Sequence, residues 1–68
     1  MNYRNGDEID VVVDRNGLED DLGVGHLSDE TMVIIVGAGG RVGECIHATI
    51  VGMERTRLGA SFLANAKM

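Results

Sequence analysis

The chain has 68 residues, which is enough for one small domain and no more. Its eleven acidic and six basic residues give a formal net charge of −5, and it contains one cysteine and two aromatic residues. These values exclude an internal disulfide framework, and they oppose indiscriminate attraction to nucleic-acid phosphates.

Short segments of alternating or β-branched apolar residues predict five strands. The first is Glu8 to Asp14, in which Ile9, Val11 and Val13 would point inward and the residues between them outward. The other four are expected at Gly23 to Leu27, Thr31 to Val36, Cys45 to Val51 and Ala60 to Ala66. In the last of these the pattern does not decide which face is inward.

Turn-forming residues separate the predicted strands. Asn16-Gly17 signals a turn and is followed by an acidic loop over Leu18 to Leu22. A tight turn is expected at Ser28 to Glu30, a glycine-rich connection at Gly37 to Gly43, and a charged turn at Arg55 to Gly59. Short strands joined in this way predict an all-β fold: a small five-stranded antiparallel barrel that forms one domain with its core at about residues 7–67.

A helix is the alternative for the segment from Glu44 to Arg57. Thr49, Ile50 and Val51 are poor helix formers, and Gly52 would lie in the helix interior. A strand is therefore preferred for this segment.

The run from Val33 to Gly43 is similar to the start of a dinucleotide-binding loop, because an apolar strand leads into Gly37-Ala38-Gly39. Val42, however, occupies the position at which the spacing requires the third glycine. Only 25 residues follow Gly43, too few for the rest of a doubly wound sheet. We therefore interpret this run as a connection between barrel strands, and a dinucleotide-binding fragment is the least favoured function.

The stretch from Gly23 to Val33, Gly-Val-Gly-His-Leu-Ser-Asp-Glu-Thr-Met-Val, resembles the TRAM domain. It is most similar to the TRAM module that follows a PIN nuclease domain in some prokaryotic proteins. The resemblance continues through Gly43-Glu44 and Cys45 to Val51, ends at Leu58 to Ala64, and covers about two thirds of the chain. The departures from the family pattern are His26 at the usual aromatic position, Glu30 at the turn glycine and Ala60 at a position that is often basic.

The resemblance implies a barrel related to OB-folds that binds RNA, often tRNA or other structured RNA. Such a module stands alone with an RNA-chaperone role or is joined to an enzyme. If the chain is complete, the stand-alone form is expected; if it is a fragment, a PIN nuclease domain is the expected neighbour. No nucleophile has a companion base nearby in the sequence, so we expect no enzymatic activity and no cofactor.

Charge is distributed unevenly along the chain. Nine of the eleven acidic residues lie in the first 30 positions, whereas four of the six basic residues lie in the C-terminal half. A mildly basic face is therefore expected on an acidic protein, and the acidic loop Glu19 to Asp21 would repel phosphate if it lay on that face. His26, at the usual aromatic position of the family, is a candidate for stacking on a base, and His47, outward on its strand, is a candidate for contact with RNA. The candidates for phosphate contacts are Arg41, Arg55, Arg57 and Lys67.

Metal binding is not expected. His26, Cys45 and His47 lack the paired short spacings of zinc ligands. The acidic segment from Asp14 to Asp21 lacks the glycine position and flanking helices of an EF-hand.

The main hypothesis is an RNA-binding module with weak sequence specificity, because few aromatic residues are present to read bases. The alternative is a protein-interaction or oligomerising barrel without RNA binding, which the negative net charge favours. We expect a monomer or a weak dimer. No membrane contact is expected, because the longest apolar run, Met32 to Val36, is too short to cross a bilayer. A single cysteine and the polar N-terminus favour a reducing, cytoplasmic setting.

Overall fold

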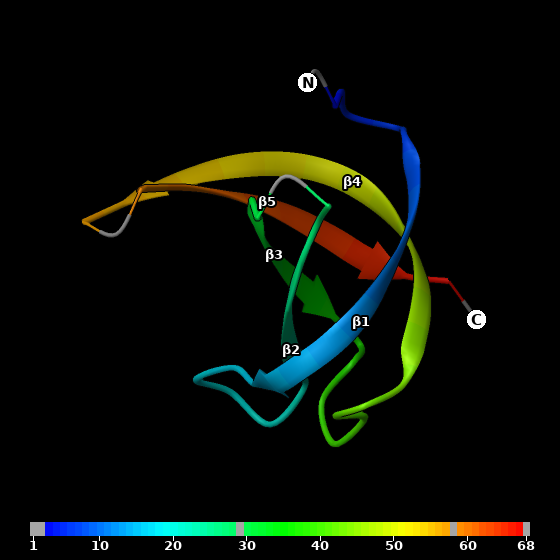
Figure 1. Ribbon diagram of the computed structural model, residues 1–68. Helices are drawn as coiled ribbons and strands as arrows, with labels where there is room; N and C mark the ends of the chain where they lie inside the picture. Colours follow the sequence, from blue (N-terminus) through cyan, green and yellow to red (C-terminus); the bar gives the residue numbers. More distant parts are fainter. Residues whose placement is uncertain (1–2, 29, 58, 68) are drawn as a thin grey trace.

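In the computed structural model the chain forms five strands in one sheet that closes into a barrel (Figure 1). The structure describes residues 3–28, 30–57 and 59–67. Within these ranges there is no helix, and therefore none that could cross a membrane. The strands are β1 Glu8–Asn16, β2 Leu22–His26, β3 Met32–Val36, β4 Cys45–Thr56 and β5 Gly59–Ala66.

The strand order around the barrel is β1-β2-β3-β5-β4, and β4 pairs with β1 to close the ring. Neighbouring strands are antiparallel except β3 and β5, which are parallel from Met32↔Ser61 to Val36↔Asn65. The expectation of an antiparallel barrel is wrong at this pair. Strand directions that alternate around a ring return to their starting sense only when the number of strands is even, so a closed ring of five must contain a parallel pair. The fold remains all-β and OB-fold-like, a five-stranded Greek-key barrel.

All five predicted strands are confirmed, with changes at their ends. The largest change is at β4, which continues to Thr56 as a hairpin with β5 and pairs Arg55 with Ala60. Most of the predicted charged turn is therefore strand, and β5 begins at Gly59. Charged residues do not distinguish a turn from an exposed two-stranded hairpin, because their long side chains are solvated in both.

The core is built from the inward faces of the strands, as their alternation predicts. In β5, where the sequence leaves the inward face undecided, Phe62 and Ala64 point inward and Asn65 is exposed. Tyr3, which precedes β1, packs edge-on against Phe62 with ring centroids 5.5 Å apart. The buried cluster consists of Ile9, Val11, Val13, Leu27, Val33, Ile35, Ala38, Ile46, Ala48, Ile50, Phe62 and Ala64.

The glycine-rich connection from Gly37 to Gly43 packs against the loop between β1 and β2. The backbone N–H groups of Gly37 and Gly39 both donate to the carbonyl oxygen of Asp21, at 2.8 and 3.2 Å. A Cβ atom on Gly39 would lie 1.7 Å from the carbonyl oxygen of Asp20, so only glycine permits this approach. The connection leads into a strand, where a dinucleotide loop requires a helix.

The tight turn between β2 and β3 contains Glu30 in the left-handed region, with φ of 68°. Its backbone N–H donates to the carbonyl oxygen of Leu27 at 2.9 Å. This is the position at which the TRAM pattern has glycine, and the left-handed conformation costs a residue with a Cβ atom about 1–2 kcal/mol. The substitution of glutamate for the glycine of the TRAM pattern at position 30 therefore falls at a residue with a strained backbone conformation.

We expect Gly39→Ala to destabilise the protein by about 1–3 kcal/mol, because the added methyl group forces the two loops apart. Gly52→Ala is the matched control: Gly52 lies in β4 and a Cβ there would meet no atom within 4 Å. Urea unfolding should show a lower midpoint for the first variant and an equal or higher midpoint for the second. Equal midpoints for the two variants would contradict the close approach at Gly39.

Candidate nucleic-acid interface

A groove of about 830 Å³ crosses the outer face of the barrel over β2, β3 and β5. Its two walls are the loop that joins β1 to β2 and the projecting hairpin of β4 and β5, which lie on the same side of the barrel in Figure 1. The residues that line it are Arg15, Asn16, Gly17, Leu18, Glu19, Leu22, Val24, Met32, Ile34, Glu54, Arg57, Ser61 and Leu63.

The floor of the groove is apolar because the outward faces of its strands carry aliphatic side chains. Val24 from β2, Met32 and Ile34 from β3, and Leu63 from β5 lie side by side in the ladder. The backbone groups of these strands pair with one another, so the side chains alone determine the chemistry of the floor. The sequence contained a signal for this surface: Met32 to Val36 is apolar on both faces, whereas a strand with one solvated face alternates.

The Gly-Val-Gly motif explains how β2 contributes to both faces. Gly23 and Gly25 face inward, where Cβ atoms would lie 3.1 Å from Val13 Cγ1 and 2.7 Å from Val11 Cγ2 respectively. Val24 between them faces outward on the groove floor. The two glycines therefore let β1 side chains fill the barrel interior while the valine supplies the floor.

Charged side chains of both signs stand around the floor. Arg15 and Glu19 come from the β1 end and its loop, and Glu54 and Arg57 from the β4–β5 hairpin. None of these four has a hydrogen-bond or ion-pair partner for its side chain among the described residues. They are therefore available to a ligand.

Arg15 enters the groove because β1 contains a β-bulge. The register between β1 and β2 shifts between Val13 and Arg15, so that Arg15 pairs with the outward-facing Val24. Strict alternation from Ile9 through Val13 would have pointed residue 15 inward, but a bulge re-aims the side chains that follow it. Arg15 was not selected from the sequence, because the basic candidates all lie in the C-terminal half of the chain and the first strand was expected to end at Asp14.

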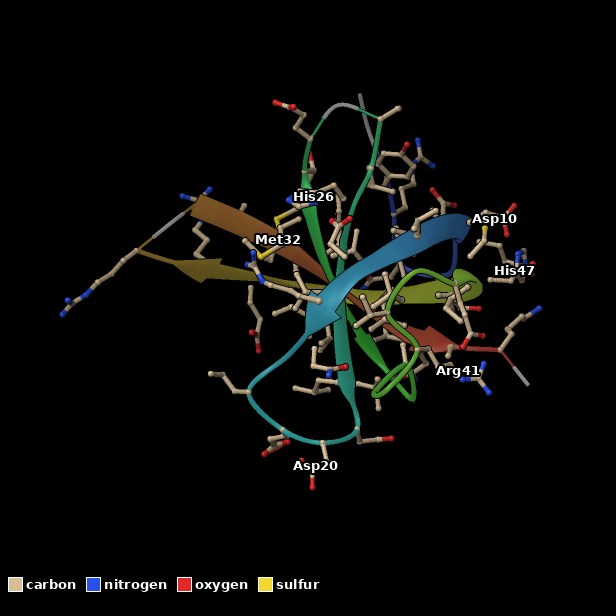
Figure 2. All side chains as sticks on the ribbon, turned by 60° about the horizontal axis from the view of Figure 1, so that its bottom comes forward. Asp10, Asp20, His26, Met32, Arg41 and His47 are labelled. Carbon is tan, nitrogen blue, oxygen red and sulfur yellow. The ribbon has the colours of Figure 1, made fainter. Side chains whose placement is uncertain are left out.

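The structure does not gather the four predicted phosphate contacts into one patch. Arg57 lines the groove, but Arg55 lies next to Glu54 on the ribbon and therefore points to its opposite face. Lys67 follows the far end of β5, about 23 Å from Ala60 at a rise of about 3.3 Å per residue. Arg41 is exposed in the β3–β4 connection, on the side of the barrel that carries His47 (Figure 2).

His47 lies between two carboxylates of β1, to which β4 is paired. Its Nδ1–H donates to Asp10 Oδ1 and its Nε2–H to Glu8 Oε1, both at 2.6 Å. Lys67 Nζ donates to the other oxygen of Glu8, Oε2, at 3.0 Å. We call these four residues the His47 cluster; Figure 2 shows Asp10 and His47 side by side.

The His47 cluster shifts two pKa values in opposite directions. The hydrogen bond to Asp10, followed by that to Glu8, raises the pKa of His47 above its ordinary value of 6.5. The hydrogen bond from His47, followed by that from Lys67, lowers the pKa of Glu8 below 4.5. The imidazolium and carboxylate forms therefore stabilise each other across β1 and β4.

His26, in β2, contacts β1 on the side opposite to β4. Its Nδ1 hydrogen-bonds Asp14 Oδ2, and both side chains are nearly half exposed. His26 pairs with Met32 in the β2–β3 ladder and lies next to it in Figure 2, so it stands beside the groove. His26 and His47 thus connect the outward carboxylates of β1 to both neighbouring strands.

The pairing of β1 with β4 brings acidic residues of the N-terminal half next to basic residues of the C-terminal half, although the two kinds are separated in the sequence. The acidic first half supplies β1, and barrel closure brings β1 against the C-terminal residues His47 and Lys67. Among the described residues no group of three His, Cys, Asp or Glu side chains is arranged to hold a metal ion. In the His47 cluster the two carboxylates bind opposite edges of one imidazole and do not converge on a point.

The stretch that resembles TRAM domains, Gly23 to Val33, forms β2, the tight turn and the start of β3, and so contributes much of the groove floor. Comparisons of the chain with protein-family models, curated proteins and solved structures found no match. The TRAM assignment therefore stays a hypothesis that rests on the motif.

We expect the His47 cluster to make stability depend on pH. The raised pKa of His47 means that its contribution is complete below pH 6.5 and is lost as pH rises through the folded-state pKa. The lowered pKa of Glu8 means that its contribution is complete above pH 4.5 and is lost as pH falls through the folded-state pKa. The difference in Tm between the wild type and His47→Gln should therefore be larger at about pH 5.5 than at about pH 8.5.

An NMR titration of the His47 ring separates the two carboxylates. Asp10→Asn should lower the pKa of His47 more than Glu8→Gln does, because the hydrogen bond to Asp10 contributes most to the shift. A His47 pKa that neither substitution changes would contradict the geometry of the cluster.

Proposed function

We propose that the protein is an RNA-binding module that holds a short unpaired segment of RNA in the groove. The observation that carries this proposal is the position of the groove. It crosses the β2–β3 face of a five-stranded barrel between the β1–β2 loop and the β4–β5 hairpin, the surface on which OB-folds bind oligonucleotides. Since a fold alone does not determine function, the free charges around the groove supply the second support.

The groove offers complementary surfaces to the two parts of a nucleotide. Bases would lie against the apolar floor formed by Val24, Ile34 and Leu63, and phosphates would meet the guanidinium groups of Arg15 and Arg57. Neither Tyr3 nor Phe62, the two aromatic residues of the chain, is among the described residues that line the groove, so stacking is weak and the backbone contacts dominate binding.

The acidic surface elsewhere would direct RNA to this groove. Outward carboxylates on β1, which does not form the groove floor, repel phosphate, and a chain of net charge −5 has little nonspecific affinity for RNA. The acidic loop lies at one wall of the groove through Glu19, where it opposes phosphate, so phosphate contacts are expected at Arg15 and Arg57. The TRAM resemblance adds the class of ligand, tRNA or other structured RNA whose loops expose unpaired bases, and a role as an RNA chaperone.

The proposal is tested by fluorescence polarisation with a labelled single-stranded RNA and with a tRNA. Two phosphate contacts on a single strand give a slope of about −1.4 for log affinity against log salt, and hence about a sevenfold loss of affinity from 50 to 200 mM salt. Arg57→Ala should weaken binding and reduce the slope by about 0.7.

Arg41→Ala is the matched control, because it removes the same charge from an exposed site outside the groove. Equal losses in the two variants would contradict binding in the groove. If neither RNA binds at low salt while light scattering shows a dimer that forms with rising concentration, the oligomerising-barrel alternative replaces the proposal.

A further inference from the structure

Glu54 occupies an unusual place for a carboxylate if the groove takes a polyanion. It lies on β4 directly opposite Ser61 of β5, which in turn pairs with Met32 of β3, so it stands over the floor of the groove. Its side chain has no hydrogen-bond or ion-pair partner in the described part of the chain. A free carboxylate here weakens phosphate binding unless it meets hydrogen-bond donors on the ligand.

The other carboxylates on the outer face of the barrel strands are engaged differently. Glu8, Asp10 and Asp14 accept hydrogen bonds from His47 and His26. Glu19 also lines the groove, but it belongs to the β1–β2 loop, whereas Glu54 is fixed within a paired strand. Among the described residues that line the groove, Glu54 is therefore the one carboxylate that a paired strand holds free for a ligand.

The chemistry of the four bases decides what a carboxylate can bind. An ionised carboxylate only accepts hydrogen bonds, and its two oxygens can accept from two adjacent donors. Guanine presents such a pair, N1–H and the 2-amino group, on its Watson–Crick edge. Adenine and cytosine each present a single amino donor beside an acceptor, and uracil presents one N–H between two carbonyl oxygens. Unpaired bases expose these edges to a protein.

We propose, on the basis of the RNA-binding function proposed above, that Glu54 makes the groove select guanine at one nucleotide of an unpaired strand. The carboxylate of Glu54 accepts from N1–H and the 2-amino group of a base that lies on the floor over Met32 and Ile34. Arg57, on the same hairpin, and Arg15, across the groove, bind the flanking phosphates. Specificity then arises at a single position, and the backbone contacts supply the rest of the affinity.

The experiment compares three labelled RNA strands of eight nucleotides: oligouridine, the same strand with one central guanosine, and the same strand with one central inosine. Inosine retains N1–H and lacks the 2-amino group. We expect affinity to fall in the order guanosine, inosine, uridine, with guanosine preferred over uridine by about 5- to 150-fold, the range that bidentate base contacts give. Fluorescence polarisation at 50 mM salt measures all three.

The decisive variant is Glu54→Gln, which keeps the size of an exposed side chain and removes its charge. Binding of the guanosine strand should weaken, because an amide offers one acceptor beside a donor. Binding of oligouridine should strengthen, because a charge that repels phosphate is gone. Glu44→Gln is the matched control: Glu44 is an exposed carboxylate outside the groove, so its loss should favour both strands equally and leave the preference unchanged.

Each outcome bears on a different claim. Equal binding of the three strands overturns selection of guanine and leaves RNA binding intact. A preference that persists in Glu54→Gln overturns the role of Glu54. Failure of every strand to bind overturns both this inference and the proposed function.

Discussion

Pairing of β1 with β4 is the contact on which the rest of the structure depends. It closes the ring, and because a closed ring of five strands must contain a parallel pair, one pair of neighbours is parallel, namely β3 and β5. It also determines which side chains meet outside the barrel, since Asp10 pairs with His47 in the ladder. Closure of the ring and the contacts of the outward carboxylates of β1 with β4 therefore both depend on one junction.

The surface at this junction and the surface at the groove differ in whether their charged side chains are paired within the protein. On the side where β1 meets β4, carboxylates are satisfied by His47 and Lys67 within the protein. Across the groove, Arg15, Glu54 and Arg57 have no such partner among the described residues. These side chains are exposed, so their charges are solvated and cost the fold little, and they are free to contact a ligand over the apolar floor of the groove.

Much of the fold follows from alternation in the sequence. Ile9, Val11 and Val13 point inward because the period of a strand is two, and five such segments separated by glycine turns predict a barrel. Strand direction could not be predicted in this way, because it depends on which strands become neighbours when the ring closes. The extent of β4 was missed for a local reason: charged residues are typical of turns and of solvated ribbons alike.

The candidate site was less accessible to sequence reasoning. Of the basic residues chosen from the sequence, Arg57 lines the groove, and Arg55, Arg41 and Lys67 lie elsewhere. These residues were chosen because they lie in the C-terminal half of the chain, where basic residues outnumber acidic ones. The groove, however, is lined by residues from both halves. The outward direction of Arg15 depends on a β-bulge. A bulge is a change of register between two paired strands, so the alternation of residues within β1 alone does not reveal it. The apolar outward face of β3 was visible in the sequence and was the better indicator of a binding surface.

The contact of Tyr3 with Phe62 has a practical consequence. These are the two aromatic residues of the chain, and one of them precedes the first strand while the other lies in the last. Tyr3 is the only tyrosine and there is no tryptophan, so the ultraviolet fluorescence of the protein comes almost entirely from one ring. That ring is a built-in optical reporter of whether the N-terminal segment remains docked on the barrel, and it can be read without any added label.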